Sequence, residues 1–335
     1  MTTRATARRG AAAAAATLTL GLLLGGCAAD LPTPDPDAVP AVPGPDLTVE
    51  QTVAVSTEVG AVLDAADEAM DSRGLDERVT GPALTMRSAQ LKAAVRAKND
   101  ELLTVLPDEM QQNVVSTTVT WPRTSLGVTV EAGDGELPRL LAYEQASARS
   151  PYKLWSWVRL FPGVELPPFA EPSVGSAAVP LDSDELLLSP QDAFSQYVDV
   201  LNLGKDSEFA KSWADDRFRQ DRAEQKAKAT KALDDVEGTW TEKFSPVDDD
   251  IRAIATTDGG ALVIGAMTGQ ETWKAPEGAK ITPQTDTEKA LLAKDPTNSL
   301  KLSGLATVAI YVPPAGADAK PTVLGAQLVL TKVTN

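Results

Sequence analysis

The sequence predicts an α+β protein in which helices come first and clustered strands follow, with this order repeated once. Residues 48–100 place apolar side chains at three- and four-residue steps, which is the spacing of one helix face. Residues 113–161 are rich in β-branched and aromatic side chains, which favour strands. Residues 189–235 and 238–333 repeat this change of texture. Strands that cluster after helices indicate α+β architecture, and we expect antiparallel sheets.

The first half is expected to hold two helices followed by four strands. One helix runs from residue 48 to a break at Gly74, and another begins after Thr80-Gly81-Pro82. The turn Gly133-Asp134-Gly135 separates two of the strands. The predicted strands cover residues 113–121, 126–131, 137–145 and 151–161.

A proline-rich segment over residues 162–180 leads into the second half. Ser189-Pro190-Gln191-Asp192 predicts a helix start, with serine as the N-cap and proline in the first turn. A second helix is expected over residues 207–235. Strands are expected over residues 238–244, 251–257, 261–273, 302–312 and 323–333. We therefore predict two α+β domains, over residues 48–175 and 176–335.

Residues 1–26 have the pattern of a signal peptide. Arg4, Arg8 and Arg9 form a basic start, and the uncharged run Ala11–Leu24 is shorter than the roughly 20 apolar residues of a spanning helix. The general secretory route is favoured over twin-arginine export, because no strongly hydrophobic pair follows Arg8-Arg9.

The uncharged run ends at Leu24-Gly25-Gly26-Cys27, which resembles the lipobox of bacterial lipoproteins. The resemblance implies that Cys27 receives diacylglycerol, that palmitate is added to the anchor, and that the mature chain sits on the outer face of the cell membrane. Residues 27–47 are rich in proline and would form an extended tether. The alternative is an ordinary secreted protein with an incidental cysteine.

The order of elements also resembles the NTF2-like, or cystatin-like, α+β fold. Three stretches, Arg78–Leu84, Pro122–Leu126 and Ser150–Leu160, look like those of an actinobacterial lipoprotein family of uncharacterised function. The resemblance covers roughly residues 50–333. It implies two tandem NTF2-like domains and brings no assigned catalytic residue.

Composition excludes several functions. The chain has no histidine and one cysteine, so it has no Ser-His-Asp triad, histidine-ligated metal or internal disulfide. Its net charge of −16 argues against nucleic acid as a partner. We expect no cofactor, no metal and no catalytic residue. The acidic clusters Asp182–Glu185 and Asp248–Asp250 are interpreted as solvated turns, with calcium binding as the alternative.

The segment Tyr152–Phe161 supplies the candidate site. Strand alternation would place Lys153, Trp155, Trp157 and Arg159 on one face, where two indole rings flanked by cations suit a sugar or an anion. The alternative is that both tryptophans belong to the core, and this alternative is favoured. The four residues are the predicted ligand or interface residues.

The first functional hypothesis is a non-catalytic lipoprotein that binds or scaffolds an envelope protein or glycan. A second is an NTF2-like enzyme that uses carboxylate, tyrosine or lysine chemistry. A third is a solute-binding lipoprotein of a transporter, which ranks last because such proteins usually alternate strands with helices.

The anchor gives the first testable prediction. Cys27→Ser removes the thiol that is alkylated, so the protein should leave the membrane fraction or keep an uncleaved leader. Lipid labelling and mass spectrometry of the mature N-terminus measure both results. Unchanged lipid labelling in the variant would refute the anchor.

Overall fold

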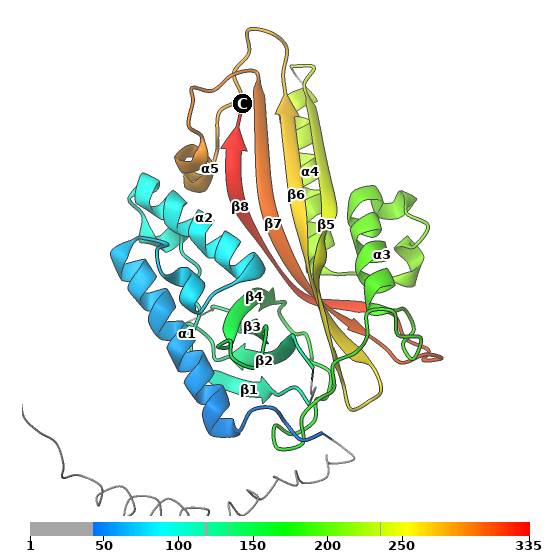
Figure 1. Ribbon diagram of the computed structural model, residues 1–335. Coiled ribbons are helices and arrows are strands. Elements are labelled where there is room, and N and C mark those ends of the chain that lie inside the picture. The colour runs from blue at the N-terminus through cyan, green and yellow to red at the C-terminus, as the bar shows by residue number, and fades with distance from the viewer. Residues whose placement is uncertain (1–42, 118–119, 134, 235) are drawn as a thin grey trace, which may run out of the picture. The chain divides into compact units, whose positions relative to one another are not determined.

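The predicted order of helices followed by strands occurs in both halves of the chain (Figure 1). The computed structural model describes residues 43–335, except residues 118–119, 134 and 235. The signal peptide, Cys27 and most of the tether lie outside the described residues, as does Asp134 of the predicted turn.

In the first half, α1 spans Val49–Ala69 and α2 spans Gly81–Ala97. Thr48 caps α1 through a reciprocal pair of hydrogen bonds with Gln51, and Pro82 lies in the first turn of α2. The strands are β1 (Met110–Val114), β2 (Arg123–Thr129), β3 (Arg139–Gln145) and β4 (Lys153–Leu160).

The strand predicted over residues 113–121 was wrong in its extent, because β1 ends at Val114. Val115, Ser116 and Thr117, which follow, leave β2 and pair elsewhere. Ser176 N donates to the Val115 carbonyl, and Thr117 N donates to the Ser176 carbonyl. This segment therefore joins the proline-rich crossing between the two halves.

In the second half, α3 spans Pro190–Leu203 and α4 spans Arg217–Asp234. The Ser189 side chain accepts a hydrogen bond from Asp192 N, as the sequence predicted. The strands and the remaining helix are β5 (Thr239–Ala255), β6 (Ala261–Lys274), α5 (Asp286–Leu291), β7 (Ser299–Val312) and β8 (Thr322–Thr334).

Two predictions in this half need correction. The helix expected from residue 207 begins at Arg217, because short 3-10 turns precede it and Asp216 Oδ1 accepts from Arg219 N at its start. The two strands expected over residues 238–244 and 251–257 are the single strand β5, whose register with β6 shifts between Pro246 and Ile251. Helix α5 was not predicted.

The strands form one antiparallel sheet in the order β1-β2-β3-β4-β8-β7-β6-β5. The α+β class and the antiparallel pairing are confirmed. The two separate sheets of a tandem arrangement are not observed, because β4 pairs with β8. This joint consists of two pairs, Arg159 with Ala326 and Leu160 with Gly325.

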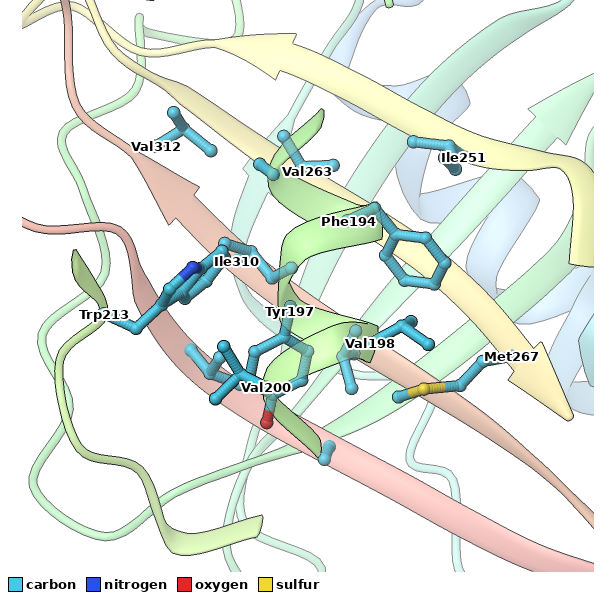
Figure 2. Close-up of a cluster of buried hydrophobic side chains, with 14 of the residues drawn as sticks. Phe194, Tyr197, Val198, Val200, Trp213, Ile251, Val263, Met267, Ile310 and Val312 are labelled. Atoms are coloured by element: carbon cyan, nitrogen blue, oxygen red, sulfur yellow. The ribbon is translucent and has the colours of Figure 1, made fainter. Parts of the chain in front are cut away.

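The buried cores tie the two halves together. Figure 2 shows one cluster, in which Phe194 and Tyr197 of α3 pack with Val263 and Ile310 of the long strands. A second cluster packs α1 and α2 against β3, β4 and the long strands. A third joins strands of both halves through the buried apolar side chains of Leu126, Leu140, Trp155, Ile254 and Leu262. Separating the halves would expose this third cluster to water.

Gly325 is required at the β4–β8 joint. A Cβ atom at this position would lie 2.4 Å from the Arg159 carbonyl oxygen and 3.0 Å from its carbon. Because both atoms are backbone, they cannot rotate away as a side chain can. Glycine is thus needed at this position because the two strands approach each other closely.

Gly325→Ala should lower the free energy of unfolding by about 1–3 kcal/mol, because the added methyl group forces β4 and β8 apart. Chemical denaturation measures this loss. Gly44→Ala is the control, since a Cβ at Gly44 meets no atom within 4 Å. Equal stabilities for the two variants would show that the joint tolerates the extra carbon.

Candidate functional site

A β-bulge in β4 divides the residues of the predicted site. Trp157 pairs with Leu141 of β3 and Leu154 pairs with Tyr143, which leaves Trp155 as the extra residue. Trp157 consequently joins the cluster under α1 and α2, whereas Trp155 joins the cluster between the two halves. The prediction that both rings share one face was wrong, because simple alternation does not hold across a bulge.

Both tryptophans are core residues, with exposed fractions of 2% for Trp155 and 0% for Trp157. The Arg252 guanidinium lies 4.6 Å from the centre of the Trp155 ring and also pairs with Glu144. Lys153 donates to the Asp76 carbonyl. These three predicted residues therefore make structural contacts. Arg159 is the exposed member of the predicted set.

Arg159 lies directly opposite Arg139 in the β3–β4 pair. The Arg139 side chain is buried, and its Nε donates to the Val105 carbonyl at 2.8 Å. It also forms an ion pair with Glu136 at 3.0 Å. The Arg159 guanidinium has no hydrogen bond or ion pair with any described residue.

The electrostatic cost of this arrangement is visible at Arg139. Burial lowers the pKa of its guanidinium, the Glu136 carboxylate opposes that shift, and the positive charges of Arg159 and Arg87 lower the pKa further. Two like charges directly opposite each other destabilise a strand pair. An anion bound between Arg139 and Arg159 would reduce this repulsion.

These arginines line a hollow of about 360 Å³ where the two halves meet, which we call the arginine groove. Its volume lies within the range of roughly 300–1,000 Å³ that small-molecule sites occupy. Glu136 and Asp221 also line it, but Glu136 already pairs with Arg139, and Asp221 already pairs with Arg217. The side chains that give the groove its chemistry are Arg139, Arg159, Phe161, Phe218, Arg222 and Gln327.

A buried polar network holds Arg222 in place. Its guanidinium lies 2.6 Å from Glu242 and 3.3 Å from Glu271, which face each other on β5 and β6. Glu271 Oε1 also accepts hydrogen bonds from the indole nitrogens of Trp240 and Trp273, each at 2.7 Å. Both carboxylates therefore accept from neighbouring donors, and through Arg222 they hold α4 against the sheet.

Sequence reasoning missed this network. Arg222 lies on a helix in which charged residues of both signs are interspersed, and Glu242 and Glu271 are two of 47 acidic residues. A signal was present in the mirrored patterns Trp240-x-Glu242 and Glu271-x-Trp273. Antiparallel strands carrying such patterns place indole opposite indole and carboxylate opposite carboxylate.

Metal binding finds no support in the part of the chain that the structure describes. No three or more carboxylate or cysteine side chains converge there as the ligands of a metal ion would. The side chains of Asp248 and Asp249, from one predicted acidic cluster, lie outside the description. None of the described helices combines the length and apolar character that crossing a membrane requires.

Comparison with known proteins places this chain in a family. The family model described as Domain of unknown function (DUF8094) matches residues 44–335. The chain belongs to this family. The DUF8094 match begins just before α1 and covers every residue of the arginine groove.

The DUF8094 chain is also similar to a protein of Streptomyces avermitilis named "Uncharacterized lipoprotein". The two are 28% identical over 270 residues, which is 78% of each chain. This agrees with the resemblance to actinobacterial lipoproteins seen in the sequence. No solved structure matches the chain.

The pH dependence of stability tests the Arg222 network. Burial raises the pKa of Glu242 above its ordinary value, although Arg222 opposes the shift. Because the folded state then binds the proton more tightly than the unfolded state, stability should fall as pH rises from the ordinary pKa through the raised one.

Glu242→Gln removes this titration. The free energy of unfolding of the wild type minus that of the variant should therefore fall across this pH window and level off above it. Denaturant titrations at a series of pH values measure the difference. A difference that stays constant or grows with pH would contradict the raised pKa.

Proposed function

We propose that this DUF8094 protein is a lipid-anchored protein of the cell envelope that binds an anionic envelope component in the arginine groove and does not transform it. The anchor would be the diacylglycerol and palmitate on Cys27, and residues 27–47 would be the tether. The lipobox-like Leu24-Gly25-Gly26-Cys27 and the similarity to a Streptomyces lipoprotein support this location on the outer face of the membrane.

The observation that carries the proposal is that Arg159, beside Arg139, pairs with no other described side chain in a chain of net charge −16. An anion bridging the two guanidinium groups would relieve their repulsion. Arginine binds phosphate and carboxylate through two parallel hydrogen bonds, which gives such a site both strength and orientation. Of the four predicted interface residues, Arg159 is the one we retain for ligand contact.

The groove walls also indicate the rest of the ligand. Phe161 and Phe218 line the same hollow as the three arginines. Both rings are largely buried, and the small part of each that faces the hollow next to the cations suits a ligand that joins an anionic group to an apolar or ring-shaped part. An envelope glycan or protein bearing a phosphate or carboxylate has this chemistry.

The predicted division at residues 175 and 176, and the NTF2-like origin of each half, are parts of this proposal. Each half supplies one side of the groove, Arg139 and Arg159 from the first and Arg222 and Gln327 from the second. We infer that the pairing of two similar modules created a binding site at their junction.

The other two functional hypotheses have less support. Acid–base chemistry by a carboxylate pair gains little support from Glu242 and Glu271, because both pair with Arg222 and Glu271 also accepts from two indoles. A solute-binding lipoprotein would be expected to have a parallel sheet with interleaved helices, and this sheet is antiparallel.

Phenyl phosphate is a suitable probe because it joins an anion to a ring. We expect the full-length protein to bind it saturably, with Arg159→Gln weakening the affinity about tenfold or more through loss of charge-assisted hydrogen bonds. Isothermal titration calorimetry measures both affinities.

Arg149→Gln is the matched control, since Arg149 is exposed and does not line the groove. Its affinity for phenyl phosphate should equal that of the wild type. If phenyl phosphate fails to bind the wild type, or binds Arg159→Gln equally well, the groove is not the ligand site.

A further inference from the structure

One face of the sheet is polar at the ends of β5–β8 that lie near the C-terminus of the chain. This face is separate from the arginine groove. On this face β5 carries Thr239, Thr241 and Lys243, and the neighbouring strands continue with threonine, serine, glutamine and lysine. Lys243, Lys274 and Lys332 are exposed and Lys301 is half-buried. A hollow of about 520 Å³ lies on this face, lined by Thr241, Gln270, Thr272, Lys274, Lys301 and Thr334 among others.

The strand register arranges these lysines in a line. Lys301 of β7 pairs with Thr272 of β6 and with Thr334 of β8. Lys274 and Lys332 each lie one strand across from Lys301 and two residues along, in opposite directions. Diagonal neighbours of this kind are about 7–8 Å apart. Lys274, Lys301 and Lys332 therefore form an oblique row across three strands.

Lys243 lies on β5, three strands across the sheet from Lys332 of β8. It pairs with Gln270, which pairs with Ser303, which in turn pairs with Lys332. Neighbouring strands lie about 4.8 Å apart, so Lys243 and Lys332 bound a strip three strand spacings wide. We call this surface, residues 239–243, 270–274, 299–303 and 332–334, the lysine face.

The lysine face is cationic in a chain that is strongly acidic. Its outward positions carry no Asp or Glu, and none of the four lysines forms an ion pair with a described residue. Repulsion between neighbouring lysines is therefore not offset by an ion pair in the part of the chain that the structure describes. The hydroxyl groups of the intervening threonines and serines add hydrogen-bond donors for anionic oxygens.

Two observations favour an extended polymer over the membrane surface. The outward positions carry no aromatic or aliphatic side chain, whereas segments that lie on membranes bury apolar groups. The face also lies beside the C-terminal end of β8, whereas the first described residues, which continue from the tether, lie beside β1 (Figure 1). Within the described residues, the lysine face and the start of the chain that follows the tether are thus at different ends.

We propose that the lysine face binds a linear polyanion of the envelope, a chain that carries a phosphate or carboxylate on each repeat. Successive charges along such a chain would contact successive lysines of the oblique row. This inference rests on a surface separate from the arginine groove, and either site can be present without the other.

Long-chain inorganic polyphosphate is the probe, and its binding to the full-length protein is measured by calorimetry at several salt concentrations. The wild type should bind with an affinity that falls steeply as salt rises, because each contact releases a counterion. Replacing the three exposed lysines, Lys243, Lys274 and Lys332, with glutamine should weaken binding at least about tenfold and flatten the salt dependence.

The control variant replaces Lys226, Lys228 and Lys231 of α4 with glutamine. These lysines are also exposed, so net charge changes equally, but α4 packs on the opposite face of the sheet. This variant should bind polyphosphate as the wild type does, which separates the lysine face from a general effect of net charge.

Two results would overturn the proposal. One is equal weakening by the α4 control, which would indicate a response to net charge alone. The other is binding of phosphatidylglycerol vesicles that requires Lys243, Lys274 and Lys332 without any binding of polyphosphate. That result would assign the face to the membrane.

Discussion

The pairing of β4 with β8 is the constraint on which the rest of this structure depends. Two residue pairs join strands from the two halves, and the absence of a side chain at Gly325 permits their approach. The joint extends by one further hydrogen bond, from Phe161 N to the Leu324 carbonyl at 2.9 Å. It thereby brings Arg159 of β4 beside Gln327 of β8 and creates the groove between the halves.

The buried and exposed arginines of the groove differ in whether they have acidic partners. Arg139 and Arg222 are held by acidic partners, because a guanidinium removed from water needs compensating charge and hydrogen bonds. Arginine suits such positions since it is weakly hydrated and presents donors in a fixed plane. Among the residues that the structure describes, Arg159 has no such partner and keeps contact with solvent, which leaves its donors available to a ligand.

Rigidity around the groove follows from the same contacts. Arg222 is fixed by Glu242 and Glu271, and Arg139 by Glu136 and the Val105 carbonyl. Side chains fixed before binding lose little conformational entropy when a ligand arrives, which increases affinity. The lysine face lacks this rigidity. Its exposed and flexible side chains can follow the charges of a polymer that binds in more than one register.

The sequence alone determined the α+β class, the capped start of α3 and the core character of Trp155 and Trp157, because these depend on local spacing and apolar content. Only the tertiary structure decided which side chains meet. A bulge separates the two tryptophans, Gly325 permits β4 to approach β8, and the pairing of β4 with both β3 and β8 sets Arg159 beside Arg139 and Gln327. No local pattern encodes such contacts, since they depend on strand register between distant segments.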